Sequence, residues 1–289
     1  MKKITASIVI YKNNLIALRK TLNSFFNSTL KGDLYVIDNS PSDVARELCT
    51  QFQIQYVHNP KNVGFGLAHN SVIDQCVKQS LYHLVLNPDV FFDAHVLEEL
   101  YEFMEHHPEA GMVMPKVLYP DGSIQKLCRL LPTPIDLFVR RFFPFKNWFK
   151  KMNDTHEMFS CGYNKIMNVP FLSGCFMFIR TSVFERVGTF DKRFFLYAED
   201  IDLSRRIHWK FKTYFYPYVK VVHVHARGSY KTLRLTWQNI KSAVLYFNKW
   251  GWFIDYERRI INKQALENIK LLNDDTLNIS RGLVRETIT

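Results

Sequence analysis

The sequence predicts an α/β fold, in which a mostly parallel central sheet is flanked by helices and followed by a C-terminal helical extension. Two observations predict it. Short apolar segments rich in β-branched residues alternate with segments whose apolar residues recur every three or four positions. Clusters of Asn, Asp, Ser and Pro follow several of the strand-like segments, where open parallel sheets bind their ligands.

The alternation is clearest in the first 119 residues. The strand-like segments are residues 4–11, 34–40, 54–58, 82–90 and 111–119. The helix-like segments between them are residues 13–26, 42–52, 68–80 and 94–106. We therefore expect a Rossmann-like layout in this part of the chain.

The second half is less regular. Residues 127–168 are rich in Pro, Phe and Lys and have no clear period, so we expect a long loop or short helices there. A strand over 169–180, broken at Ser173-Gly174, a short helix over 181–187 and a strand over 212–226 follow. Helices begin near Thr232. We predict one domain over 1–230, with halves of about 1–92 and 93–230, and a helical extension over 231–289.

The chain is basic: its 289 residues include 38 Lys and Arg against 27 Asp and Glu, a net charge of +11. Nucleic acid, phosphorylated small molecules and an acidic membrane surface are all suitable partners. Much of the excess lies in two aromatic stretches, at 129–151 and 231–259. No nucleic-acid motif accompanies them, so we do not expect nucleic acid as a partner. A membrane interface suits them, and so does a half-buried, solvated face.

The cysteines and the apolar runs indicate the compartment. Five cysteines are scattered without metal-binding spacing, which favours reduced thiols in a cytoplasmic protein. The apolar run from Ala6 to Tyr11 is too short for a signal peptide. No apolar stretch approaches the length of about 20 residues that a spanning helix needs. We expect a cytoplasmic protein that lies at most peripherally on the inner face of the cell membrane.

Two clusters of carboxylates suggest chemistry. Asn87-Pro88-Asp89 ends a strand, where the Asp89 carboxylate could hold Mg²⁺ or Mn²⁺ together with a substrate diphosphate. Taken alone, the pattern is better explained by a plain turn. Glu199, Asp200 and Asp202 crowd together at an expected helix start, where capping explains one or two of them. A general base would explain the others, and we choose Asp200, with Glu199 second.

Two further patterns are weaker. His223 and His225 share one face of a strand and suit a metal or a diphosphate, although a structural role is the commoner one. The segment from Asn62 to Asn70 has glycines at 64 and 66, which let the backbone approach a ligand before a helix. It lacks the third glycine of the dinucleotide fingerprint.

Taken in order, these motifs resemble glycosyltransferase family 2, an inverting family with the GT-A fold. The resemblance spans about 4–230 and is greatest for the bacterial rhamnosyltransferase branch. SIVIYKNN resembles the start that lines the nucleotide pocket, which implies roles for Tyr11 and Asn13. VIDNSPSD implies that Asp38 contacts the base, with Asn39 beside it. NPKNVGFGLAHN implies that Asn62, Gly64 and Asn70 surround the nucleotide.

The remaining motifs carry the reaction. LNPDV resembles the metal motif, with Asn87 at the first acid and Asp89 as the remaining ligand. FLSGCFMFIR, with Gly174, resembles the floor of the sugar and acceptor site. YAEDIDLSRR implies that Asp200 is the catalytic base, and VVHVHARGS implies that His223 completes the metal site. His225 and Arg227 depart from the small residues usual there.

The resemblance implies inverting transfer of a sugar from a nucleotide-sugar donor, with Mg²⁺ or Mn²⁺ as cofactor. It favours L-rhamnose from dTDP-rhamnose, and a lipid-linked oligosaccharide acceptor in O-antigen or capsule synthesis. UDP-glucose and UDP-galactose remain alternative donors. A nucleotidyltransferase would normally have a glycine-rich basic loop after the first strand, where YKNNLIALRK stands here. A non-catalytic nucleotide-sugar-binding protein would not need Asp89, Glu199, Asp200 and His223 together.

Overall fold

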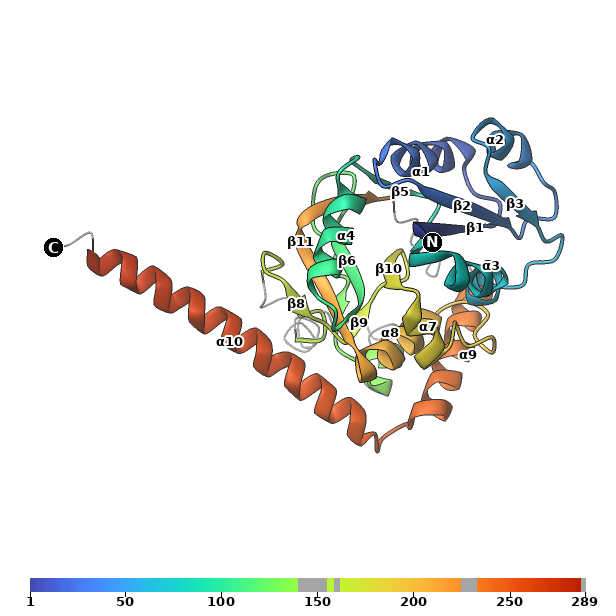
Figure 1. Cartoon of the computed structure of the whole chain (residues 1–289). Helices are drawn as coiled ribbons and strands as arrows, with labels where there is room; N and C mark the ends of the chain where they lie inside the picture. The colour runs from blue at the N-terminus through green and yellow to red at the C-terminus, as the bar shows by residue number, and fades with distance from the viewer. Residues whose placement is uncertain (140–154, 159–161, 225–232, 287–289) are drawn as a thin grey trace.

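The computed structural model describes residues 1–139, 155–158, 162–224 and 233–286. Within them a nine-stranded sheet has the order β3-β2-β1-β4-β10-β6-β11-β5, and β8 pairs with β11 (Figure 1). Its strands are β1 (Lys2–Ile10), β2 (Gly32–Asp38), β3 (Gln55–His58), β4 (Ser80–Leu86), β5 (Val90–Phe92), β6 (Ala110–Leu118), β8 (Met167–Asn168), β10 (Phe176–Arg180) and β11 (Lys212–His223).

The pairing confirms the predicted α/β class. Strands β1 to β4 are mutually parallel, in keeping with helical crossovers between them, and β11 runs parallel to β6. Strand β10 lies antiparallel between β4 and β6. The predicted strand at 82–90 is wrong in one respect: it ends at Leu86, and Val90 opens the separate strand β5, which pairs with β11. The turn at Asn87-Pro88-Asp89 makes this break.

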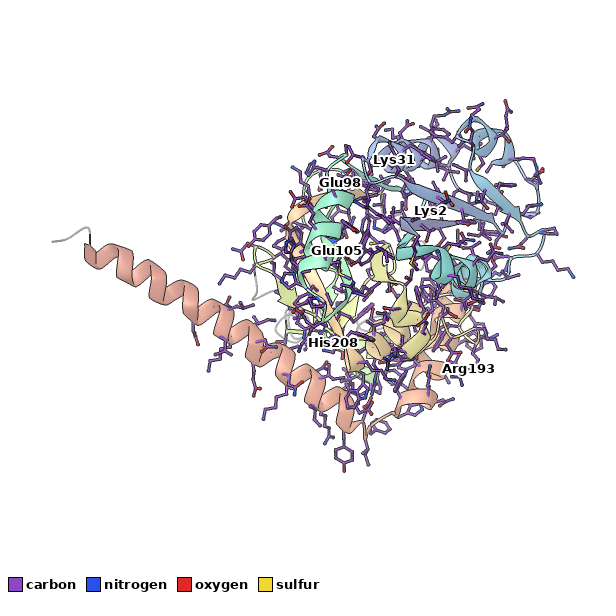
Figure 2. All side chains as sticks on the ribbon, in the orientation of Figure 1. Lys2, Lys31, Glu98, Glu105, Arg193 and His208 are labelled. Carbon is purple, nitrogen blue, oxygen red and sulfur yellow. The ribbon has the colours of Figure 1, made fainter. Side chains whose placement is uncertain are left out.

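Helices flank the sheet at the predicted places. They are α1 (Leu15–Asn27), α2 (Arg46–Gln51), α3 (Phe65–Gln79), α4 (Val96–His106), α7 (Ser182–Val187) and α8 (Glu199–Lys210). Asn14 caps α1, because its side-chain oxygen accepts hydrogen bonds from the backbone N–H groups of Ile16 and Ala17. Glu98 on α4 accepts hydrogen bonds from Ser28, Thr29 and Leu30, which ties α4 to the loop after α1. Figure 2 labels Glu98 of α4 and Lys31 of that loop.

The segment predicted to be irregular contains little regular structure where it is described. Strand β7 (Cys128–Arg129) pairs with β9 (Phe171–Leu172) in a small second sheet, and a π-helix spans Ile135–Val139. The basic and aromatic residues of the predicted stretch from 140 to 151 lie outside the described residues, as does Cys161. The four described cysteines, Cys49, Cys76, Cys128 and Cys175, are buried.

Helices α9 (Leu233–Trp250) and α10 (Tyr256–Glu286) follow the sheet domain, and α10 extends far from the body of the molecule (Figure 1). Both are joined to α8 by buried ion pairs. Arg205 of α8 donates two hydrogen bonds to Asp255, at 2.7 and 2.8 Å. Asp202 of α8 is fully buried and contacts Lys249 at 2.6 Å and the Trp250 indole N–H at 2.8 Å.

These contacts correct part of the predicted basic-aromatic stretch. Trp250 packs against the Arg205 guanidinium at 4.0 Å, and Arg258 is only 5% exposed and donates a hydrogen bond to the carbonyl of Pro132. Trp252 stacks on Phe138. These three residues therefore hold helices together, and a membrane face cannot be built from them. Among the described helices, none is long and apolar enough to cross a membrane.

We expect Asp255→Ala to lower the free energy of unfolding by about 3–5 kcal/mol, because it leaves the Arg205 guanidinium buried without its main partner. Glu257→Ala is the matched control. It removes a second carboxylate from the same guanidinium, at 3.3 Å, but its side chain is 46% exposed, so a loss of about 1 kcal/mol or less is expected. Urea unfolding followed by fluorescence measures both. Equal losses would contradict the assignment of Asp255 as the buried anchor.

Candidate functional site

The predicted site residues of the first half gather at one edge of the sheet. Ile10 pairs with Asp38 across β1 and β2, and Ile8 pairs with Leu86 across β1 and β4. The carboxyl ends of three neighbouring parallel strands therefore meet there. Tyr11, Asn39 and Asn87, which directly follow these strands, lie along that edge, as expected for a ligand-binding crevice.

The loops after β1 and β2 are bound to one another. The Lys12 N–H donates to the Ser40 hydroxyl at 2.8 Å, and the Asn13 side chain accepts from the Tyr11 N–H at 2.7 Å. Tyr11 is 42% exposed and remains available to a ligand. Asp38 is fully buried, and its carboxylate accepts hydrogen bonds from the Ser40 N–H and the Tyr56 hydroxyl. Asp38 thus shapes the loop, and its contact with a base stays a prediction.

The glycine-bearing segment is attached to the same edge. Asn39 donates from its side-chain amide to the carbonyl of Gly64 at 3.1 Å, and Asn62 accepts from the Gly64 N–H at 2.9 Å. Asn70 lies one helical turn inside α3 and is engaged elsewhere. Its amide donates to the carbonyl of Phe190 and its oxygen accepts from the Phe190 N–H. Asn70 therefore fixes the segment before α8 against α3.

Asn87, Asp89 and His223 come together at the next position along the edge. The His223 Nε2 atom lies 3.5 Å from the Asp89 Oδ1 atom and 3.5 Å from the Asn87 Nδ2 atom. The backbone supports this approach, because the Val224 N–H donates to the carbonyl of Asp89 where β11 pairs with β5. His225 and Arg227 lie outside the described residues.

Gln125 orients His223 and was not identified from the sequence. Its side-chain oxygen lies 3.0 Å from the His223 Nδ1 atom, and its amide donates to the His223 carbonyl at 2.7 Å. Burial lowers the pKa of His223, but the Cys175 and Asp89 side chains overcome this and raise the pKa to about 10. The surroundings of the His223 side chain, including the Asp89 carboxylate, thus favour a positive charge on or near its ring. No motif marks Gln125, which lies in a polar turn.

Asp89 and His223 fit a divalent cation as a partial ligand set. No group of three or more His, Cys, Asp or Glu side chains suited to a metal occurs among the described residues. One carboxylate and one imidazole nevertheless match a cation that takes its remaining ligands from substrate phosphates and water. Gln125 bonded to the other ring nitrogen supplies the outer support typical of a metal-binding histidine.

The second cluster lies at the start of α8. Tyr197 and Ala198, directly before it, both have left-handed backbone angles, with φ of 71° and 64°. This is strained for residues that carry a side chain, and such strain concentrates at functional sites. The Asp200 carboxylate accepts hydrogen bonds from the Gly174 N–H at 3.0 Å and from the Ile201 N–H at 2.9 Å. A Cβ at position 174 would lie 3.1 Å from the Asp200 Cβ, so a side chain there would crowd the Asp200 carboxylate.

Burial shifts both carboxylates of this pair. It raises the pKa of Glu199 well above its usual range, and the neighbouring Asp200 charge adds to the effect. Burial also raises the pKa of Asp200, while the two N–H donors and the charge of Arg129 counteract it. Glu199 is 4% exposed and its Oε2 atom is buried without a hydrogen-bond partner in the structure. Burial thus favours the protonated form of Glu199, whereas the two N–H donors and the Arg129 charge favour the ionised form of Asp200 and counteract the rise in its pKa.

Arg129 is the second residue that the sequence did not mark as part of the site. It lies on β7 opposite Phe171 of β9, with its guanidinium 5.9 Å from that ring. Strand β9 leads directly to Gly174, which brings Arg129 into electrostatic range of Asp200. Its Nε atom is buried and has no hydrogen-bond partner. The local sequence shows only a basic residue in an irregular segment.

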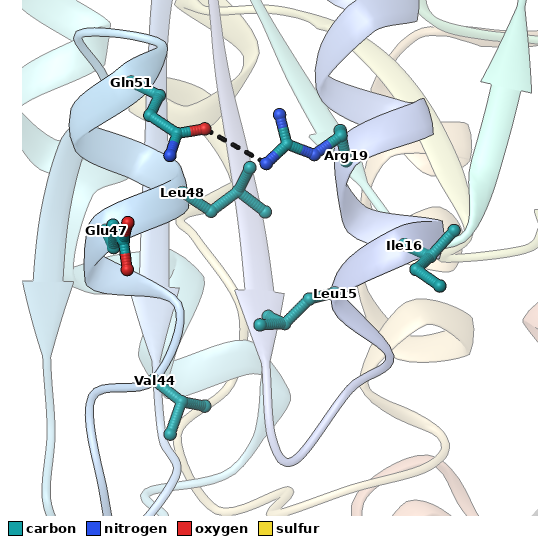
Figure 3. Close-up of a pocket in the computed structure, with 7 residues that line it drawn as sticks. All are labelled: Leu15, Ile16, Arg19, Val44, Glu47, Leu48 and Gln51. Carbon is teal, nitrogen blue, oxygen red and sulfur yellow. Dashed lines mark hydrogen bonds between the residues drawn. The ribbon is translucent and has the colours of Figure 1, made fainter.

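One cavity of about 280 Å³ lies elsewhere, between α1 and α2 (Figure 3). Arg19 donates a hydrogen bond to Gln51 across it, and its walls include exposed apolar residues such as Ile16 and Val44. None of the predicted site residues lines it. It therefore offers no place for the predicted chemistry.

Comparisons with known proteins identify the family. Residues 7–188 match the family model described as glycosyl transferase family 2. The chain is 28% identical over 185 residues to the N-acetylglucosaminyl-diphospho-decaprenol L-rhamnosyltransferase of Mycobacterium tuberculosis. The aligned residues cover 59% of each chain. It is 24% identical over 257 residues to the rhamnosyltransferase WbbL of Escherichia coli, which covers 82% of this chain and 86% of that one. The match thus spans about three fifths of the M. tuberculosis relative.

Solved structures share the fold at low sequence identity. GalNAc-T7 with UDP, GalNAc and Mn²⁺ superposes with a TM-score of 0.57 at 15% identity, over 77% of this chain and 43% of that one. TarS of S. aureus superposes with a TM-score of 0.53 at 13% identity, over 79% of this chain and 38% of that one. These structures support the fold, and the family match covers more than half of the sequence. The chain belongs to glycosyl transferase family 2.

Proposed function

We propose that this glycosyltransferase transfers L-rhamnose from dTDP-rhamnose to a lipid-linked saccharide, with inversion at the anomeric carbon. The observation that carries the proposal is the placement of Asp200. Its carboxylate is held by the Gly174 N–H, and the next residue, Cys175, accepts a hydrogen bond from the Asn87 N–H. A base and a diphosphate-binding edge therefore lie on either side of one short loop.

In this mechanism Asp200 accepts the proton of the acceptor hydroxyl while that oxygen attacks the anomeric carbon. The bond to the nucleoside diphosphate breaks in the same step, so the configuration inverts. Asp89 and His223 would hold a divalent cation, which when bound supplies neutralisation of the departing diphosphate. Tyr11, Asn13 and Asn39 would surround the nucleotide, with Asp38, Asn62, Gly64 and Asn70 supporting their loops.

The choice of sugar and acceptor rests on the named relatives. Two of them are rhamnosyltransferases, and the name of one specifies a diphosphate-linked lipid that carries N-acetylglucosamine. A third relative, Agl10 of Haloferax volcanii, is named a hexosyltransferase and is 27% identical over 189 residues. UDP-glucose and UDP-galactose therefore stay as the second candidate donors. We assign catalysis to residues 1–230, and we propose that residues 231–289 form a helical extension that associates with the membrane.

We expect Asp200→Asn to lower turnover by about 10²–10⁴-fold, because general-base catalysis is lost. Release of nucleoside diphosphate is measured with dTDP-rhamnose, UDP-glucose, UDP-galactose and UDP-N-acetylglucosamine, with Mg²⁺ or Mn²⁺ present. Asp74→Asn, an exposed carboxylate on α3, is the control and should keep full activity. Binding of dTDP should survive in both variants. Wild-type turnover in Asp200→Asn would rule out this residue as the base.

Metal removal tests the proposed cation site separately from catalysis. We expect dTDP to bind at least tenfold more weakly in EDTA than with Mn²⁺, and Asp89→Asn to abolish that difference. Gln125→Leu should weaken Mn²⁺ binding by about 10–100-fold, because it releases His223 from its outer support. Calorimetric titration measures both affinities. A wild-type affinity for dTDP that EDTA leaves unchanged would contradict a metal at Asp89.

The pH dependence of activity tests the role of Arg129. A positive charge favours the carboxylate form of Asp200, so its removal raises the pKa of the base. The acidic limb of the kcat/KM profile should therefore move to higher pH by about 1 unit or more in Arg129→Met. Arg129→Lys keeps the charge and should stay near wild type. A uniform loss of rate in Arg129→Met without a shift of the limb would assign Arg129 a purely structural role.

A further inference from the structure

The turn between α9 and α10 exposes an unusual concentration of large apolar side chains. Phe253 is 77% exposed, Ile254 69%, Tyr256 70% and Ile260 52%. We call these four residues the tip. Isolated exposed apolar residues are ordinary on a protein surface, but a contiguous group marks an interaction site.

The conformation of the turn is fixed by its neighbours. Gly251 has φ of 97°, and a Cβ there would lie 2.6 Å from the carbonyl oxygen of Ile254, so the chain turns back tightly at this point. Trp252 stacks on Phe138, and Asp255 is buried against Arg205. The residues on either side of Phe253 and Ile254 are thus held inward. The tip points outward because the turn is anchored on both sides.

Basic residues border the tip. Arg259 and Lys263 are exposed and lie on the same face of α10 as Tyr256 and Ile260, at spacings of three and four residues. The nearby acidic residues are largely engaged: Asp255 with Arg205 and Arg258, Glu257 with Arg205, and Glu267 with Lys263. The whole chain carries a net charge of +11. Arg259 and Lys263 thus give this face of α10 two exposed cations for an anionic partner, and Lys263 would exchange Glu267, 3.8 Å away, for that partner.

We propose that the tip docks on an anionic lipid bilayer, with Phe253, Ile254, Tyr256 and Ile260 entering the headgroup region and Arg259 and Lys263 contacting lipid phosphates. Aromatic and aliphatic side chains beside Lys and Arg are the combination that interfacial segments use. A binding site for a free phosphate compound would not need the four apolar side chains. This docking does not depend on the proposed function. The proposed function gives only the reason why docking on a bilayer would be useful.

The tip is also connected to the candidate base. Asp255, directly after Ile254, is bonded to Arg205, and Arg205 lies on α8, which begins with Glu199 and Asp200. A bilayer contact at the tip would thus fix the height and orientation of α8 above the membrane. A lipid-linked acceptor would then meet the base at a constant depth.

Vesicle co-sedimentation tests the proposal with the full chain and no donor. Vesicles of phosphatidylcholine mixed with phosphatidylglycerol are compared with phosphatidylcholine alone. We expect wild type to bind the anionic vesicles, and the double variant Phe253→Ser/Ile254→Ser to bind them about tenfold more weakly or worse. The matched control is Ile16→Ser/Tyr218→Ser, which removes side chains that are 71% and 67% exposed elsewhere and should bind like wild type.

A charge variant separates the electrostatic contribution to vesicle binding from the contribution of the apolar side chains. Arg259→Gln/Lys263→Gln should lose about tenfold or more on anionic vesicles and nothing on neutral ones. Unchanged far-UV circular dichroism and thermal unfolding show that each variant is folded, and because neither readout involves dTDP, this test stays distinct from failure of the proposed function. Equal vesicle binding by the tip variant and wild type would overturn the proposal. So would a wild-type dimer in sedimentation velocity that the tip variant abolishes while vesicles stay unbound.

Discussion

The site depends on the short loop from Ser173 to Cys175, which interrupts what would otherwise be one continuous strand. Two consecutive residues of this loop form backbone hydrogen bonds to different parts of the site. The Gly174 N–H donates to the Asp200 carboxylate, and the Cys175 carbonyl accepts from the N–H of Asn87 at the end of β4. The candidate base and the edge that carries Asp89 are thereby attached to two consecutive residues of one loop.

Helix α8 must approach this loop in a strained conformation, and its other contacts maintain it. Left-handed angles at Tyr197 and Ala198 cost on the order of 1–3 kcal/mol each. The buried pairs of Arg205 with Asp255 and of Asp202 with Lys249 hold α8 from its far side. The C-terminal helices thus contribute to the geometry of the base although they lie outside the residues that match the family.

Local patterns predicted much of this architecture. The α/β alternation, the break at Ser173-Gly174 and the helix that begins at Glu199 all depend on periodicity and turn residues within a short window. The roles of Asp38 and Asn70 were harder to infer, because their partners, Tyr56 and Phe190, come from elsewhere in the chain. The resemblance to the family assigned the candidate residues to one site before any contact between them was known.

Gln125 and Arg129 were missed because they act through residues distant in sequence. Gln125 and His223 are hydrogen-bonded although they lie 98 positions apart in the sequence. Arg129 lies near Asp200 because β7 pairs with β9. The positions of Trp250 and Arg258 were left open between a membrane face and a half-buried face for the same reason. Composition indicated a basic, aromatic surface, but only tertiary contacts show that these two side chains face inward while Phe253 and Ile254 face outward.

The central claim is that Asp200 acts as a base in a single displacement. The most direct measurement is the anomeric configuration of the product, determined by proton NMR. The wild-type chain would be given dTDP-β-L-rhamnose and a short-chain analogue of an N-acetylglucosaminyl diphosphate lipid. The account predicts an α-L-rhamnoside. A β-L-rhamnoside would require two displacements or a front-face attack, and would contradict the role assigned to Asp200.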